Sequence, residues 1–224
     1  MGLVETLRAS EIHQRPGLDD WRYILGAMET IFRAGSFTAA GELIAALSRL
    51  ADERDHHPEV DLRYPDRVHV VLSTHVAGGV TERDLDMARE VSRVAAAAGC
   101  TSGVAVAGRE VAIDALDIDA VRPFWQAVLG YQEGPSARHG QVIDIVDPLR
   151  IGPPFWFQQM DKPRTERNRF HIDVTVPPEL AEERIQAALA VGGRLVSDSA
   201  ARAFWVLADA EGNEACICTW QDRD

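Results

Sequence analysis

The spacing of apolar residues changes twice along the first half of the chain, and this pattern is the sequence feature that limits the possible folds most strongly. Across residues 36–55 apolar side chains recur every three or four positions, which predicts an amphipathic helix. Residues 60–72 instead alternate apolar and polar side chains on both sides of Pro65-Asp66, the pattern of a β-hairpin. The helical period returns over residues 81–94. Helix, hairpin and helix in succession predict an α+β unit in which helices cover one face of an antiparallel sheet.

Local chemistry marks the ends of the two expected helices. Ser36 or Thr38 can cap the first, and Thr81 stands three residues before Asp84 in a capping-box arrangement at the start of the second. A proline follows His57, and because proline disfavours helical geometry in the residue before it, the first helix is predicted to end there. The residues expected to face inward are Phe37, Ala40, Leu43, Ile44, Leu47, Leu50, Ala51, Val60, Leu62, Tyr64, Val68, Val70, Leu72, Leu85, Ala88, Val91 and Val94.

The second half of the chain contains a weak internal repeat. Residues 110–132 and 169–196 each read as a strand, an acidic or proline-rich turn, a helix, a glycine and a strand. Further strand-like segments follow each copy, "QVIDIV" and "PFWFQQM" after the first, "AFWVLAD" and "EACICTW" after the second. Each copy therefore predicts a βαβββ unit, and two such units are expected to pair and bury a common sheet face.

Small residues without an apolar period fill positions 95–108 and indicate a linker. The domains are accordingly expected at residues 1–98 and 109–224, with residues 99–108 joining them.

Charge and cysteine content exclude several classes of function. A formal net charge of -12 with a sequence pI near 5.0 argues against nucleic acid as a direct partner, because such binding requires lysine and arginine to neutralise phosphates. No segment approaches the roughly 20 apolar residues of a membrane span, and the N-terminus lacks a signal-peptide pattern. The three cysteines imply no disulfide framework. A cytoplasmic protein that binds neither membrane nor nucleic acid is expected.

The stretch "RDHHPEV" places two histidines side by side at the end of the first predicted helix. His56 and His57 should project in different directions from that end. In the segment "VHVVLSTH", alternation puts His69, Ser73 and His75 on one face of a strand, with His75 last. A third imidazole is thus available, although periodicity alone leaves open whether His75 lies beside the other two.

Together these motifs resemble one enzyme family. "DERDHHPEV", a tyrosine six residues after the proline, "VHVVLSTH" and "AGGVTERD" are similar to the signature of the pterin-4a-carbinolamine dehydratases, over about residues 5–98. Two features depart from that pattern: Val60 stands where an aromatic residue is common, and the turn after Tyr64 is one residue longer.

The resemblance implies residue roles. His56, His57 and His75 would surround the 4a-hydroxyl of the pterin, with His57 and His75 transferring protons and His56 orienting the hydroxyl. No metal and no cofactor would take part. The residues expected to contact the substrate are Ser73, Thr74, Glu59 and Asp84.

The chemistry suits imidazoles independently of the resemblance. Dehydration of a carbinolamine protonates a departing hydroxyl while a ring N–H loses its proton, and an imidazole with an ordinary pKa of about 6.5 populates both forms near neutral pH. A bare His-His pair is most often a solvated helix end. Three histidines could also hold zinc, but adjacent histidines diverge and the similar family uses no metal.

The second half resembles the glyoxalase-like branch of the vicinal oxygen chelate superfamily, over about residues 109–220. "DALDIDAVRPFWQAVLGY", "NRFHIDV" and "FWVLADAEGNEACI" carry this resemblance. It implies metal ligands on the first and last strand of each βαβββ unit. His171 matches one such position; the others fall at Glu110 or Ala112, at Gln158 or Gln159, and at Cys216, where a glutamate is typical. The set is incomplete, so a degenerate metal site and a cleft for a small organic molecule are expected.

The sequence therefore predicts a hydro-lyase that converts 4a-hydroxytetrahydrobiopterin to quinonoid dihydropterin and water, fused to a glyoxalase-like domain. A homo-oligomer, most simply a dimer, is the expected assembly. Two alternatives stay open. Dehydratases of this family also serve as dimerisation cofactors of a transcription factor, which would make the first half a binding module. The second half could instead be a metal-dependent glyoxalase or dioxygenase.

Overall fold

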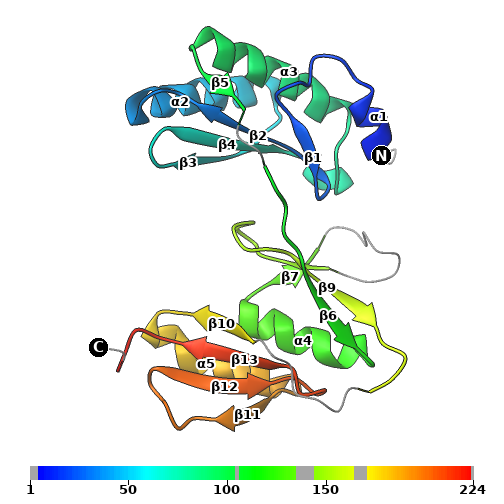
Figure 1. Ribbon diagram of the computed structural model, residues 1–224, viewed down its shortest axis with the longest axis vertical. Coiled ribbons are helices and arrows are strands. Elements are labelled where there is room, and N and C mark those ends of the chain that lie inside the picture. The colour runs from blue at the N-terminus through cyan, green and yellow to red at the C-terminus, as the bar shows by residue number, and fades with distance from the viewer. Residues whose placement is uncertain (1–4, 104–105, 135–143, 164–170, 223–224) are drawn as a thin grey trace. The chain divides into compact units, whose positions relative to one another are not determined.

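The computed structural model describes residues 5–103, 106–134, 144–163 and 171–222. The chain divides into two units, residues 1–108 and 109–224, and each is treated by itself (Figure 1). None of the helices that the structure describes is both long and apolar enough to span a bilayer.

The first unit is an antiparallel sheet with helices on one face, as predicted. The strands run in the order β1-β2-β4-β3, and Figure 1 shows α2 and α3 on the same side of this sheet. The elements are α1 (Ala9–His13), β1 (Arg22–Ile24), β2 (Ala27–Arg33), α2 (Phe37–Arg54), β3 (Glu59–Arg63), β4 (Arg67–Leu72), the 3₁₀ helix η1 (His75–Ala77), α3 (Glu82–Ala97) and β5 (Thr101–Ser102).

The core of this unit lies between the two long helices and the sheet. Side chains on β2 and β4 alternate between buried and half-buried, which is the period-two pattern of a strand with one face covered. Leu43, Leu47 and Leu85 are almost wholly buried, and each contributes roughly 1.5–3 kcal/mol by leaving water. Two residues predicted to face inward do not: Phe37 occupies the exposed first turn of α2, and Tyr64 lies beyond the end of β3.

Helix α2 ends three residues earlier than the proline suggests. Asp55 has a left-handed backbone (φ 48°), a conformation that aspartate tolerates better than most residues. The N–H of Asp55 donates to the carbonyl of Asp52, and the N–H of His56 donates to that of Ala51. This pair of bonds is a Schellman motif, which satisfies carbonyls at the helix end. It also fixes the backbone of His56 before the chain enters β3.

Two residues of the segment expected to be a linker form a short strand. Thr101 and Ser102 form β5, which pairs antiparallel with Arg33 and Phe32 at the end of β2. Two residues are too short for periodicity to reveal, so only the partner strand identifies them as a strand.

The second unit contains two βαβββ halves, as predicted. The first half comprises β6 (Val111–Ala115), α4 (Ile118–Leu129), β7 (Gln132–Glu133), β8 (Ile145–Val146) and β9 (Phe155–Gln159); the second comprises β10 (Ile172–Thr175), α5 (Pro178–Ala190), β11 (Arg194–Ser197), β12 (Phe204–Ala208) and β13 (Glu214–Cys218). The sheets run in the orders β6-β9-β8-β7 and β10-β13-β12-β11, and in each the first and last strands pair in parallel. Part of the segment expected to form the third strand lies outside the described residues.

Both halves contribute to one core. Phe124 and Val128 of α4, Ile185 of α5 and Ile217 of β13 belong to the same buried cluster. The indole N–H of Trp125 donates to Asp209 Oδ2 at 3.0 Å, which joins α4 to the loop after β12. Because the two halves share this core, neither half needs a further element to cover the apolar face of its sheet.

Candidate functional site

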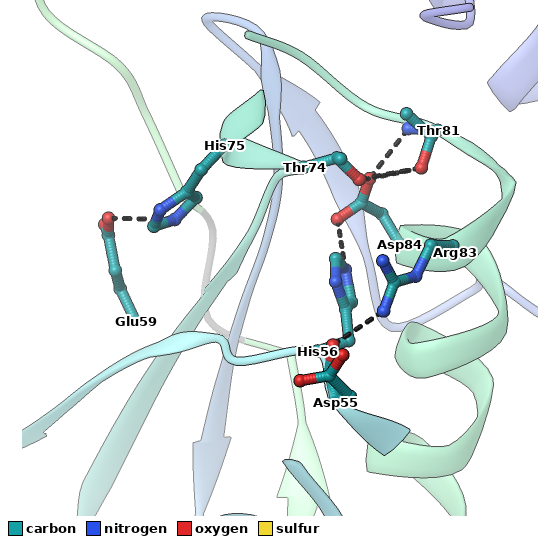
Figure 2. Close-up of polar contacts among 8 residues, drawn as sticks. All are labelled: Asp55, His56, Glu59, Thr74, His75, Thr81, Arg83 and Asp84. Atoms are coloured by element: carbon teal, nitrogen blue, oxygen red, sulfur yellow. Dashed lines mark hydrogen bonds and ion pairs between the residues drawn. The ribbon is translucent and has the colours of Figure 1, made fainter. Parts of the chain in front are cut away.

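The most deeply held histidine of the first unit is His56. It is 8% exposed, and its Nε2 lies 2.7 Å from Oδ1 of Asp84, which is wholly buried in the first turn of α3 (Figure 2). This contact occupies Nε2 of His56, so Nδ1 is the ring nitrogen left for other contacts.

The other carboxylate oxygen of Asp84 binds both sides of the loop that carries His75. Oδ2 accepts from the hydroxyl of Thr74 at 2.7 Å and from the backbone N–H of Thr81 at 2.7 Å, and the two threonine hydroxyls lie 2.7 Å apart. The capping box predicted at Thr81 is therefore confirmed. The same carboxylate also contacts the His56 ring and accepts from the Thr74 hydroxyl. Asp84 is wholly buried and Thr74 nearly so, and their expected contact with a substrate stays a prediction.

Arg83 secures the backbone next to His56. Its guanidinium donates to the carbonyl of Asp55 at 2.6 Å, at the left-handed end of α2 (Figure 2). Consecutive residues of α3 thus hold both the backbone before His56 and its ring. Sequence reasoning missed Arg83, because nothing in the motif indicates which carbonyl its side chain reaches.

His57 and His75 both face solvent. Each side chain is 62% exposed, and each has an acidic neighbour: His57 Nε2 lies 3.2 Å from Asp52 Oδ1, and His75 Nε2 lies 3.9 Å from Glu59 Oε1. His56 and His57 do diverge, as predicted. His75 begins the 3₁₀ helix η1 rather than continuing the face of β4, because the strand ends at Leu72.

Two contacts tie the histidine-bearing segments together. Asp84 links His56 to Thr74, the residue before His75, while Glu59 lies near His75 itself (Figure 2). Residues 56–59 and 74–75, which are separate in sequence, therefore lie close together, where α2 leads into β3 and β4 leads into η1. His56 is thus buried and held by Asp84, whereas His57 next to it and His75 on the facing loop are exposed.

The remaining predicted contact residues sit close to these segments. Ser73 and Glu59 are half-buried and lie next to Thr74 and in β3, respectively. His69 lies on the open face of the sheet, where Glu29 and then Asp61 hold its pKa above the ordinary value. His69 thus belongs to a separate ion-paired cluster.

In the second unit, a cavity of about 390 Å³ opens beside β6 and the start of β10. Trp125, Phe155 and Met160 give it an apolar side, and Asp114, Glu211 and Glu214 give it an acidic one. A concave site of this size, with apolar side chains on one side and polar ones on the other, can take a small molecule.

The ligand positions expected from the resemblance are only partly filled by metal-binding side chains. In the first half Ala112 pairs with Trp156, and the Gln159 amide donates to the carbonyls of Leu116 and Met160. Ala112 has no metal-binding side chain and the Gln159 amide is engaged within the chain, and the degenerate metal site expected from the sequence stays a prediction. In the second half His171 borders the cavity and its Nδ1 lies 3.6 Å from the sulfur of Cys216.

Cys216 is not a ready nucleophile. Burial, and then the hydrogen bond and charge of Asp173, raise the pKa of Cys216 to about 12. Its side chain is therefore a protonated thiol near neutral pH, and thiolate is the reactive form. All three cysteines are free, as predicted.

Comparisons with known proteins divide the chain in the same two parts. Residues 5–94 match the family described as pterin 4 alpha carbinolamine dehydratase, and residues 110–218 match the glyoxalase-like domain family. A curated protein of Sulfolobus acidocaldarius, provisionally named pterin-4-alpha-carbinolamine dehydratase, is 35% identical over 89 residues, which cover 39% of this chain and 97% of that protein. One of the same name from Mycolicibacterium smegmatis is 35% identical over 79 residues, covering 35% of this chain and 83% of that protein.

The chain is also similar to solved structures. A transcriptional coactivator/pterin dehydratase from Brucella melitensis is 34% identical and covers 41% of this chain and 99% of its own, with a TM-score of 0.38. A glyoxalase/bleomycin resistance protein/dioxygenase family enzyme from Burkholderia phytofirmans is 22% identical, covers 49% of this chain and 95% of its own, and has a TM-score of 0.41.

Proposed function

Because the chain belongs to the pterin 4 alpha carbinolamine dehydratase family through residues 5–94, we propose that its first unit dehydrates 4a-hydroxytetrahydropterins. The observation that carries this proposal is the Asp84 carboxylate, which holds His56 and the residue before His75 at once. Residues 110–218 form a glyoxalase-like domain, and the proposal assigns the dehydration to the other unit alone.

The reaction needs two proton transfers and no electron transfer. The bond between C4a and the hydroxyl oxygen breaks as the hydroxyl takes a proton and leaves as water, and a ring N–H gives up its proton to form the quinonoid dihydropterin. A positioned imidazole accelerates such a transfer by roughly 10²–10⁴-fold.

In the proposed division of labour the exposed histidines move protons. His57 and His75 are open to solvent, so each can meet a bound pterin and then exchange its proton with water. Asp52 and Glu59 stand beside them and can stabilise the charged imidazolium.

His56 is proposed to orient the hydroxyl through Nδ1, since Asp84 occupies Nε2. Asp84, Thr74 and Arg83 then act through His56 as positioning residues rather than on the pterin. Ser73 and Glu59, which are half-buried at the edge of the site, are proposed to contact the substrate.

The test is a direct assay of the purified full chain on a 4a-hydroxytetrahydropterin, following formation of the quinonoid product by its absorbance. We expect turnover well above the spontaneous rate, unchanged after thorough chelation, because imidazoles alone exchange the protons. Absence of turnover would refute the proposal. If activity vanished with the chelator and returned with Zn²⁺, the reaction would depend on a metal ion and not on imidazole acid–base catalysis alone.

A further inference from the structure

The loop that carries His75 is also held by the segment that precedes α1. The N–H of Leu7 donates to the carbonyl of Val80 at 2.7 Å, and the side chain of Thr6 lies against Gly79. We term residues 5–8 the N-terminal strap. The strap thus reaches a segment of the candidate site from a distant part of the sequence.

Inside the loop, backbone hydrogen bonds close a short turn around His75. The N–H of Thr74 donates to the carbonyl of Gly79 at 2.9 Å, and two N–H groups of the turn donate back to the Thr74 carbonyl at 3.0 Å. The backbone beside His75 is therefore paired with Gly79, the neighbour of the residue that Leu7 binds. A shift of Val80 would pass through this pairing to His75.

The same loop has a second anchor at its two ends. Asp84 accepts from the hydroxyl of Thr74 and from the N–H of Thr81 (Figure 2). The side chain of His75 is 62% exposed, so packing around the ring does little to fix it. Its position therefore depends on the loop backbone, which Asp84 and the strap hold together.

The two glycines of the loop have different reasons to be glycine. Gly78 has a left-handed backbone (φ 67°) at the end of η1, a conformation that glycine adopts freely. The backbone of Gly79 is not left-handed, so its conformation does not require glycine. A Cβ at Gly79 would lie 3.1 Å from the methyl carbon of Thr6, which is closer than ordinary contact. The missing side chain at Gly79 thus lets the strap approach the loop.

The contact with the strap is unfavourable to lose. Val80 is 1% exposed, so its carbonyl has little access to water, and a buried carbonyl without a donor is costly. The side chain of Leu7 packs against the core of the first unit as well. Burial therefore keeps the strap on the loop in the folded protein.

We propose that the N-terminal strap is a positioning element of the dehydration site, which holds the His75 loop where the imidazole meets the pterin. This inference rests on the proposed function, in which His75 transfers a proton. The strap acts through Val80 and Gly79 and not on the substrate. Because a misplacement of about 1 Å can slow a reaction by about 10²-fold, a loosened strap should lower kcat more than it raises KM.

The experiment compares two substitutions of Leu7 in the full chain. Leu7→Ala and Leu7→Pro both shorten the side chain, but only proline also removes the N–H that the Val80 carbonyl accepts. With a 4a-hydroxytetrahydropterin as substrate, we expect Leu7→Pro to lower kcat by roughly 10-fold, with KM changed by less than about threefold, and Leu7→Ala to lower kcat less. Amide hydrogen exchange at Thr74 should be faster in Leu7→Pro than in Leu7→Ala, because the loop opens more often.

A second pair of variants tests the strap without proline. Gly79→Ala should lower kcat several-fold, because the added methyl presses on Thr6. Adding Thr6→Ser, which removes the Thr6 methyl and keeps the hydroxyl, should restore kcat. Arg15→Ala removes an exposed ion pair between another part of the N-terminal segment and Glu82, and it should leave kcat unchanged. This pair keeps the inference testable if Leu7→Pro does not fold.

The outcomes separate this inference from the proposed function. Wild-type kcat in Leu7→Pro and in Gly79→Ala, beside a slowed His75→Ala, would overturn the role of the strap and leave the proposed function intact. Equal falls in kcat for Leu7→Ala and Leu7→Pro would also overturn it, as would a lower unfolding temperature with kcat of the folded variants unchanged. If His75→Ala turned over at the wild-type rate, the proposed role of His75 and this inference would fail together.

Discussion

Among single residues, Asp84 joins side chains that lie far apart along the chain. It accepts from His56, 28 positions earlier, and from Thr74, 10 positions earlier, while also capping the helix in which it stands. Its burial means that every one of these donors replaces water around the carboxylate. Removing one partner of such a group leaves the others unsatisfied, which costs roughly 1–3 kcal/mol for each buried polar atom.

Asp84→Asn tests this positioning role. The variant keeps the shape of the side chain but brings an amide group whose nitrogen cannot accept from the surrounding hydroxyl and N–H groups, so the ring of His56 should lose its fixed orientation. We expect a fall in kcat of about 10-fold or more with a smaller change in KM, because misplacement weakens the reacting geometry more than binding. A purely structural role predicts a lower unfolding temperature with kcat of the folded protein unchanged.

At the level of helices and strands, the most consequential feature is where α2 ends. Asp55 adopts the left-handed conformation, and its carbonyl accepts from Arg83. The turn that positions His56 therefore depends on the left-handed backbone of Asp55. Glycine adopts it freely, whereas a β-branched residue does so only with strain.

Asp55→Gly should therefore retain both stability and activity, and Asp55→Val should lose about 1–2 kcal/mol of unfolding free energy, the cost of a left-handed β-branched residue. Urea denaturation of the two variants measures the difference. Equal stability of the two would show that the helix end does not require the left-handed state.

This helix end also shows what sequence patterns can and cannot predict. The proline after His57 correctly indicated a boundary, but the residue at which α2 stops depends on which position adopts the left-handed turn, and aspartate gives a weaker signal of it than glycine. Periodicity similarly predicted β4, but not that His75 begins a 3₁₀ turn. Apolar period fixes strands and helices because burial is their main driving force; contacts such as those of Arg83 and Asp173 arise only from tertiary packing.

The molecule as a whole consists of two units with separate cores. The buried cluster of the first unit extends from Ile12 to Ala95, and that of the second from Ile113 to Ile217. The fold class of the second unit could be predicted from its internal repeat, because each βαβββ copy leaves an apolar sheet face that only a partner half covers.

Separate cores predict functional independence. His171→Ala should leave the dehydration rate of the full chain unchanged, since His171 belongs to the other unit. A steady-state assay of the variant beside the wild-type protein measures this. A fall in the dehydration rate of the folded variant would indicate that the second unit takes part in the first reaction.

The histidines themselves give the most direct test of the account. His57→Ala and His75→Ala each remove one exposed proton-transfer group, and His13→Ala removes an exposed histidine of the same unit from outside the site. Single-turnover dehydration of a 4a-hydroxytetrahydropterin should slow by roughly 10² or more in each of the first two variants, with circular dichroism unchanged and the His13→Ala rate equal to the wild-type rate. Wild-type rates in both His57→Ala and His75→Ala would contradict the assignment of this site to dehydration.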